Sequence, residues 1–250
     1  MAEPLLRIAG LRKNFGALVV TDGVDLDLRA GETHAVIGPN GAGKTTLVGQ
    51  LFGEISPDAG VILFDGEDIT GEPPEKRAAR GIARTFQITC VLPGFSALDN
   101  VALAVQARHG SSFRFFGRAA AETALNEAAA RALDRIGLLS RAHVPAGSLA
   151  HGEKRLLELA MALAQEPRLL LLDEPMAGIG EEEGRALTEL LAQLKGHIAI
   201  LLVEHDMRAV FALADRISVL VYGRIIATGT PAQIRAHPEV RAAYLGEEAA

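Results

Sequence analysis

The sequence has little of what several classes of protein require. It holds a single cysteine, Cys90, so a disulfide framework is excluded and a reducing compartment fits. We interpret Cys90 as a small apolar filler, because no His or second Cys neighbours it. Basic residues are not in excess either: the net charge is −6 and the pI is near 5.7, so a nucleic-acid partner is not expected.

Long apolar runs are also missing. No run approaches the roughly 18 residues that cross a bilayer. Residues 1–4 show neither the basic nor the apolar region of a signal peptide. No Cys/His/Asp cluster has the spacing of a metal site. These absences favour an ordinary globular protein, and the hydrophobic fraction of 49% and charged fraction of 22% agree.

Strands and helices alternate at both ends of the chain. Residues 24–28 alternate apolar and acidic side chains, as an antiparallel strand with one wet face does. Residues 169–172 are four leucines in a row, which is typical of a parallel strand buried on both faces. The other predicted strands are 5–9, 33–37, 60–64, 198–203, 217–221 and 223–228, and the predicted helices are 44–52, 181–194, 207–214 and one that starts at 231–236.

The middle of the chain has a different character. From about 96 to 164 it is rich in Ala, Leu, Arg and Glu with helical spacing, which predicts helices over 119–136 and 153–165. The loop 110–117 carries three aromatics, which we expect to pack on their own domain. The chain is therefore predicted to be α/β, with a core of residues 1–87 and 165–250 interrupted by a helical subdomain at about 88–164.

A glycine-rich loop follows the predicted strand 33–37 and opens the predicted helix. It matches the phosphate-loop pattern G-x-x-x-x-G-K-[ST] in full, where backbone N–H groups and a helix N-terminus bind phosphate oxygens. Lys44 is expected to reach the β- and γ-phosphates of ATP, and the Thr45 hydroxyl to ligate Mg²⁺. The residues expected to bind ATP here are Gly38, Pro39, Asn40, Gly41, Ala42, Gly43, Lys44, Thr45 and Thr46.

Two adjacent acids end the leucine strand. Asp173 is expected to face Mg²⁺, and Glu174 to polarise the water that attacks the γ-phosphate. Acids at the end of a strand are common at the start of a solvated loop, so the pair alone is a weak signal. Behind a complete phosphate loop it predicts ATP hydrolysis.

These motifs resemble those of the ATP-binding-cassette (ABC) family, and the resemblance covers the whole chain. It implies a P-loop NTPase core with a mixed sheet, an N-terminal antiparallel β subdomain and a helical insertion. It also implies that Gln87 contacts Mg²⁺ and the water, that His205 contacts the γ-phosphate and orients Glu174, and that Phe15 stacks on adenine. Gln87 and His205 would join Glu174 as catalytic residues, and Gln87 would share Mg²⁺ with Thr45 and Asp173.

The signature motif departs from the family pattern L-S-G-G-Q. The chain has Leu149-Ala150-His151-Gly152-Glu153. Ala150 replaces a serine whose hydroxyl would bind ATP held by a partner subunit, a loss of about 1.5–3 kcal/mol if nothing replaces it. The loop after the acids, 177–180, also lacks the family's usual aspartate. These changes suggest a heterodimer whose two chains contribute unequally, although a homodimer stays open.

Several details resemble ATPase subunits of importers for branched-chain amino acids and related amides. They are Ala83 to Gln87, Glu174 to Gly178, Glu204 to Met207 and, above all, the tail His237 to Gly246. The resemblance implies a peripheral subunit on the cytoplasmic face of the inner membrane, which energises uptake with a second ATPase chain, integral-membrane permease subunits and, indirectly, a solute-binding protein. The insertion, from about 88 to 150, would dock the permease. The solute and the direction of transport are not set by this chain.

Three other functions share the ATP site. A soluble scaffold ATPase, as in iron–sulfur cluster assembly, is disfavoured by the tail and by the context of Gln87. A DNA-repair cassette would need a larger insertion. A regulatory subunit that does not hydrolyse ATP is disfavoured by Glu174 and His205.

Overall fold

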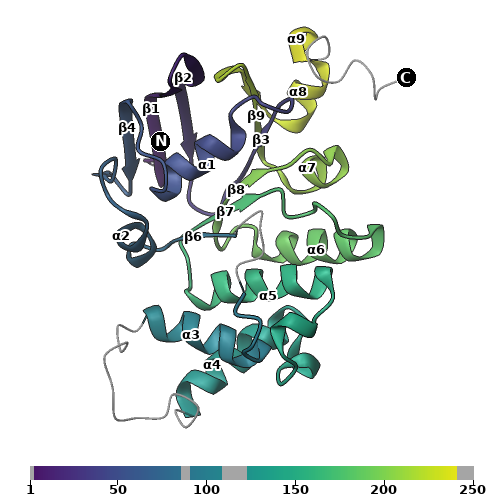
Figure 1. Ribbon diagram of the computed structural model, residues 1–250. Coiled ribbons are helices and arrows are strands. Elements are labelled where there is room, and N and C mark those ends of the chain that lie inside the picture. The colour runs from purple at the N-terminus through teal and green to yellow at the C-terminus, as the bar shows by residue number, and fades with distance from the viewer. Residues whose placement is uncertain (1–2, 86–90, 109–122, 241–250) are drawn as a thin grey trace.

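The computed structural model describes residues 3–85, 91–108 and 123–240, and it places two sheets side by side (Figure 1). The first sheet is antiparallel, in the order β2-β1-β4-β5. Its strands are β1 (Leu6–Phe15), β2 (Leu18–Leu28), β4 (Ala59–Phe64) and β5 (Glu67–Asp68). One face of β2 is buried and the other is wet, as its alternating sequence predicts.

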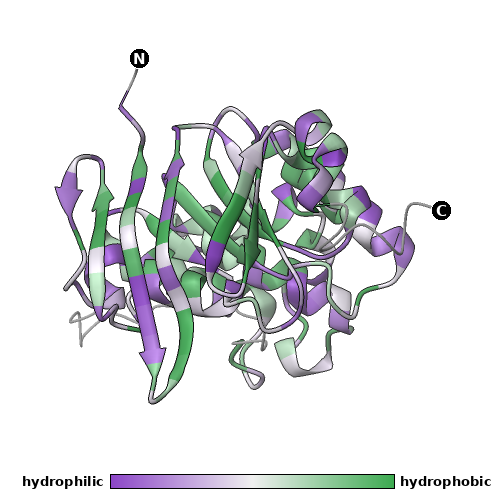
Figure 2. Ribbon diagram, turned by 90° about the horizontal axis from the view of Figure 1, so that it is seen from above, coloured by the Kyte–Doolittle hydropathy of each residue, from purple (hydrophilic) through white to green (hydrophobic). Residues whose placement is uncertain are grey.

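The second sheet is mainly parallel, in the order β10-β9-β3-β8-β7-β6, with only β10 antiparallel. Its strands are β3 (Thr33–Ile37), β6 (Ile82–Arg84), β7 (Leu169–Asp173), β8 (Ala199–Val203), β9 (Arg216–Val221) and β10 (Arg224–Gly229). Every residue of β3, β7 and β8 is buried. Burial on both faces explains why β7 and β8 are continuous apolar runs. The central strands are accordingly coloured as hydrophobic in Figure 2.

Helix α1 (Lys44–Phe52) lies between the two sheets. Leu169 and Leu171 of β7 pack in its cluster, which also takes side chains from β1, β2 and β4. Leu170 and Leu172 point the other way, into a larger cluster with α5 (His151–Ala164), α6 (Glu181–Leu194) and α7 (Met207–Leu213). Successive side chains of a strand face opposite sides, so β7 serves two cores.

The C-terminal end of α1 is capped by a buried arginine. Arg77 lies in the short α2 (Pro74–Ala79) and is 1% exposed. Its guanidinium donates to the carbonyls of Gln50 and Leu51, which end α1, at 2.7 and 2.8 Å, and also to the carbonyls of Thr70 and Glu72. Burial lowers the pKa of Arg77, with Glu72 opposing this. The arginine satisfies helix-end carbonyls that would otherwise lack partners.

A polar network is buried in the six-stranded sheet. The ring of His34 in β3 lies 3.0 Å from the carbonyl of Asp27 and 2.8 Å from the hydroxyl of Ser218. Burial, followed by the charge of Arg216, lowers the pKa of His34 to about 4. His34 is therefore neutral at physiological pH.

The helical part lies on the opposite side of the six-stranded sheet from α1 (Figure 1). It consists of α3 (Ala97–Arg108), α4 (Thr123–Arg135), α5 and two short 3-10 turns (Leu139–Arg141 and Ala146–Ser148). Buried Asn100 accepts from the N–H of Leu92 at 2.8 Å and donates to the carbonyls of Leu92 and Ser96. This side chain fixes the chain entering α3. Helices α8 (Pro231–Ala236) and α9 (Pro238–Val240) follow β10.

The predicted α/β fold, with an antiparallel subdomain and a helical insertion, is confirmed. The elements 33–37, 44–52 and 181–194 have the predicted bounds. The predicted strands at 5–9 and 24–28 are longer, because β1 and β2 continue through polar residues into a hairpin at Gly16. Helix α2 and strand β6 were not predicted. Cys90, the loop 110–117 and the start of the predicted helix 119–136 lie outside the described residues. In the described part, no helix is long and apolar enough to span a membrane.

Candidate active site

The glycine-rich loop connects β3 directly to α1. Gly43 has φ of 103°, and a Cβ there would lie 2.4 Å from the carbonyl oxygen of Val20. Gly41 also has positive φ, at 78°, yet a Cβ there would meet nothing within 4 Å. A side chain at position 43 is therefore excluded by both conformation and space, whereas position 41 is restricted by conformation alone.

The ammonium group of Lys44 lies inside this loop. It donates to the carbonyls of Gly38 at 2.8 Å and Pro39 at 3.1 Å, and the residue is 6% exposed. Burial lowers the pKa of Lys44, and the charges of Glu174 and Asp173 oppose that shift. The structure thus brings the lysine of the loop within electrostatic reach of both predicted acids.

Asp173 ends β7 and is fully buried. Its Oδ2 accepts from Arg84 at 3.2 Å, and Oδ1 has no hydrogen-bond partner among the described residues. Burial raises the pKa of Asp173, while the charge of Arg84 opposes this. A buried carboxylate oxygen without a partner in the described part of the chain fits a ligand for Mg²⁺, which prefers carboxylate oxygen.

Glu174 leaves the strand in a left-handed conformation, with φ of 51°. Its N–H donates to the carbonyl of Val203 at 2.8 Å, which ties the end of β7 to the end of β8. A left-handed conformation costs a residue with a side chain roughly 1–2 kcal/mol. The neighbouring strand holds Glu174 in that conformation, directly after Asp173.

His205 follows β8 and its side chain is 58% exposed. Its N–H donates to a carboxylate oxygen of Glu204 at 2.8 Å. Glu204 is fully buried and also accepts from the N–H groups of Asp206 and Met176. Because β7 and β8 are parallel neighbours, the structure places His205 and Glu174 at the same edge of the sheet.

The remaining predicted ATP contacts lie in different settings, and their contacts with ATP stay predictions. Thr45 and Thr46 lie at the start of α1, exposed and half-buried. Phe15 ends β1 and is 51% exposed, with the Lys13 ammonium 5.5 Å from its ring centre. Adenine stacking on Phe15 stays a prediction. Gln87 lies outside the described residues.

The signature residues lie elsewhere, at the start of α5. A Cβ on Gly152 would lie 2.5 Å from the carboxylate of Glu183, and one on Gly178 would lie 3.2 Å from Nε2 of His151. Leu149 is buried, whereas Ala150 and His151 are exposed. The signature residues therefore contact the loop after the acids and the start of α6, on the opposite side of the sheet from α1.

Glu153 has a visible role in that motif. Its carboxylate accepts from the N–H of Ala150 at 2.9 Å and pairs with Arg141 at 3.0 Å. An acid at this position satisfies one of the N–H groups that begin a helix and interacts favourably with the helix dipole. The substitution that sequence reasoning treated as a departure thus stabilises the start of α5.

Sequence reasoning assigned no role to two residues of the site. Arg84 is the ion-pair partner of Asp173 and also pairs with Glu54, which follows α1. Glu204 accepts hydrogen bonds from backbone N–H groups in the loop after β7 and in the turn after β8. Both residues lie in segments that carry the resemblance to the importer subgroup. Arg84 is the last residue of β6 and Glu204 follows β8, and a charged residue at the end of a strand is the signal that could have identified them.

The comparisons with known proteins agree with this geometry. The family model described as ABC transporter matches residues 21–177, and a model for the branched-chain amino acid ATP-binding cassette transporter matches residues 224–250. Among solved structures, the chain is similar to a nucleotide-free ATP-binding cassette from an ABC transporter, with a TM-score of 0.85, 28% identity, and 98% of this chain and 100% of that chain covered. It is equally similar to the ADP conformation of MJ1267, an ATP-binding cassette of an ABC transporter, with a TM-score of 0.85, 29% identity and the same coverage.

Curated relatives extend over the full length. The chain is 40% identical to the high-affinity branched-chain amino acid transport ATP-binding protein BraF of Pseudomonas aeruginosa, over 99% of this chain and 100% of that protein. It is 41% identical to LivG of Escherichia coli K12, which has the same description, over the same shares. The chain therefore belongs to the ABC transporter family, as an ATP-hydrolysing subunit of the branched-chain amino acid group.

Proposed function

We propose that this ATPase energises the uptake of branched-chain amino acids or related amides. One observation carries the ATPase part of the proposal: the glycine-rich loop joins β3 to α1, and Asp173 ends the nearby β7 with a buried carboxylate oxygen that has no partner among the described residues. The similarity to BraF and LivG and the match at residues 224–250 support the solute class.

The residues at the site divide the work on ATP. Backbone N–H groups of the loop 38–45 and the ammonium of Lys44 would hold the phosphates, and Phe15 the adenine. Thr45, Gln87 and Asp173 would hold Mg²⁺, which when bound neutralises charge on the β- and γ-phosphates. Oδ1 of Asp173, buried without a described partner, supports this assignment.

Glu174 would accept the proton of the attacking water. His205 would contact the γ-phosphate and orient Glu174, with Gln87 as a further contact to the water. The exposure of the His205 side chain and the fixed backbone on both sides of it support this role, because the imidazole is accessible to a ligand while its position is restrained.

The assembly extends beyond this chain. We place it on the cytoplasmic face of the inner membrane, paired with a second ATPase chain, whose nucleotide would meet the signature residues 149–153. The helical part would dock integral-membrane permease subunits, which receive the solute from a binding protein. The proposed domain division, with a helical subdomain at about 88–164, puts that docking surface away from the nucleotide loop.

The test of the ATPase assignment is Glu174→Gln. This change should leave ATP binding intact and lower kcat at least about 100-fold, because a general base contributes 10²–10⁴-fold. Glu189→Gln, at an exposed acid of α6, is the matched control and should behave as the parent. Parent-like turnover by Glu174→Gln would show that another group activates the water.

The solute class needs a separate experiment. The chain, its partner ATPase and the permease subunits are reconstituted in vesicles with the binding protein, and ATPase activity is measured with leucine, isoleucine, valine, urea or short amides. Stimulation by a branched-chain amino acid or an amide supports the proposal. Stimulation only by an unrelated solute would overturn the solute class and leave the ATPase assignment standing.

A further inference from the structure

A single buried carboxylate connects two loops at the catalytic edge. The side chain of Glu204 follows β8 and is fully buried. Its Oε1 accepts from the N–H of Met176 at 2.7 Å, and its Oε2 accepts from the N–H groups of His205 at 2.8 Å and Asp206 at 3.1 Å. The first bond reaches the D-loop, residues 176–180, and the other two reach the switch segment, residues 205–206.

The hydrogen bonds of Glu204 restrict the movement of the two loops relative to each other. A buried carboxylate is costly unless it is hydrogen-bonded, and three backbone donors supply those bonds here. If either loop moves away, the carboxylate loses donors in a place that water does not reach. The D-loop and the switch segment are therefore held at one fixed separation, although 28 residues separate Met176 from Glu204 in sequence.

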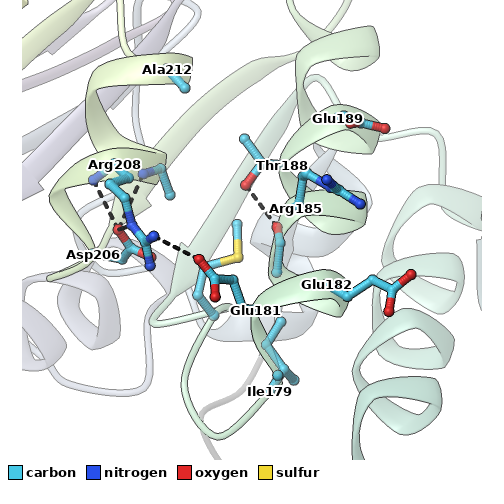
Figure 3. Close-up of a pocket in the computed structure, with 13 residues that line it drawn as sticks. Ile179, Glu181, Glu182, Arg185, Thr188, Glu189, Asp206, Arg208 and Ala212 are labelled. Carbon is cyan, nitrogen blue, oxygen red and sulfur yellow. Dashed lines mark hydrogen bonds and ion pairs between the residues drawn. The ribbon is translucent and has the colours of Figure 1, made fainter.

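A second link, between the helices that follow these two segments, has the opposite character. Glu181, at the start of α6, pairs with Arg208 in α7 at 2.8 Å across the groove between these helices (Figure 3). Both side chains are at least 80% exposed. An exposed ion pair contributes about 0–1 kcal/mol. The link through Glu181 and Arg208 is therefore weak, and the link through buried Glu204 is strong.

We infer that Glu204 is a positioning residue that makes the D-loop and the switch segment move as one unit. When His205 shifts toward a bound γ-phosphate, Glu204 carries the shift to the D-loop, which lies beside the signature residues of this chain. Occupation of the chain's own ATP site is thereby transmitted to the surface it offers a partner. This inference rests on the proposed function, since it needs a γ-phosphate for His205 to contact.

One substitution separates the two halves of the contact. Glu204→Gln keeps one acceptor oxygen and replaces the other with an NH₂ group, which cannot accept from an N–H. The remaining oxygen should face His205 and Asp206, where it keeps two bonds, so the bond to Met176 is lost. Glu181→Gln is the matched control, because it removes the same charge from the exposed ion pair with Arg208.

The experiment is hydrogen–deuterium exchange of the full chain, with and without a non-hydrolysable ATP analogue. In the parent, nucleotide should slow exchange in both segments with the same midpoint. In Glu204→Gln, amides of 176–180 should exchange about tenfold faster, as expected for the loss of one charge-assisted hydrogen bond, and lose their response to nucleotide. The switch segment, residues 205–206, should still respond to nucleotide, and Glu181→Gln should match the parent.

Kinetics provide a second readout in the assembled transporter. Glu204→Gln should lower kcat with KM for ATP unchanged, because the phosphate contacts stay intact. The inference would be overturned if the D-loop of Glu204→Gln exchanged no faster than that of the parent, or if it still responded to nucleotide. If the variant does not fold, the parent decides alone: different midpoints for the two segments contradict a common motion. A parent that binds no nucleotide would instead refute the proposed function.

Discussion

The sheet core and the helical part of this molecule differ in what they bury. Within the described residues, the sheet core buries charged or ionisable side chains, including His34, Lys44, Arg77, Asp173 and Glu204. The helical part buries mostly Ala and Leu, and its buried polar groups are Asn100 and the adjacent Arg155 and Glu158. Polar burial is costly and persists where it holds a site or fixes a loop. The comparison agrees with the proposal that the ATP chemistry resides in the sheet core and that the helical part supplies a docking surface.

The two walls of the ATP site follow the same division. In the proposed site, the wall from the sheet core would supply Lys44, Asp173, Glu174 and His205. The wall proposed for a partner has Ala150 where the family has serine, and would depend on backbone N–H groups at the start of α5. Changes in the core should therefore have large effects on function, and changes at the signature small ones.

The largest effect is expected from Gly43→Ala. A Cβ there would lie 2.4 Å from the Val20 carbonyl, so the loop must distort, and ATP affinity should fall at least about 100-fold. Gly41→Ala is the control, because it shares the positive φ without the clash, and its cost of roughly 1–2 kcal/mol limits the loss to about tenfold. Titration calorimetry with ATP measures both. Equal losses in the two variants would mean that conformation, and not space, controls the loop.

A smaller effect, on stability, is expected from His34. Its pKa of about 4 lies below the ordinary value of 6.5, so the unfolded chain binds a proton that the folded chain rejects. Stability is fully present above pH 6.5 and falls as the pH drops toward 4, with a loss of about 2 kcal/mol between pH 7 and 5.

Urea unfolding of the parent and of His34→Asn at both pH values isolates this contribution. The variant should be less stable at pH 7, because it lacks part of the buried network, but should lose less on acidification. His143→Gln, at an exposed position of the helical part, is the control. The same acid loss in the parent and in His34→Asn would show that other groups set the pH dependence.

The smallest effect is expected at the signature. Ala150→Ser restores a hydroxyl at the start of α5. Because backbone N–H groups there already replace part of the lost bond, ATP binding at the partner's site should strengthen by only the lower end of the range, about 1.5 kcal/mol or roughly tenfold. The measurement is ATP affinity at that site in the assembled ATPase pair, and Ser148→Ala, two residues earlier and exposed, is the control. A gain well above tenfold would break the comparison, since the signature would then limit the site as strongly as the core does.

The sequence predicted the parts of the fold and site that depend on local pattern. The strand 33–37, the helix 44–52 and the acids after 169–172 are each specified by a contiguous run of residues, and each lies where it was predicted. The roles of Arg84 and Glu204 could not be predicted in this way. Arg84 meets Asp173 across 89 residues, and Glu204 meets Met176 across 28, so neither contact leaves a periodic signal. Likewise, β6 has only three residues and depends on pairing with β7.

The four consecutive leucines of β7 face two hydrophobic clusters in turn, which has a consequence for how the molecule unfolds. Strands β3, β7 and β8 each send side chains into both hydrophobic clusters. If one cluster loses its packing, these strands are disrupted and the other cluster loses the side chains that they contribute to it. The nucleotide-binding half and the helical half thus share one cooperative transition, and the chain should not populate a form with only one of them folded.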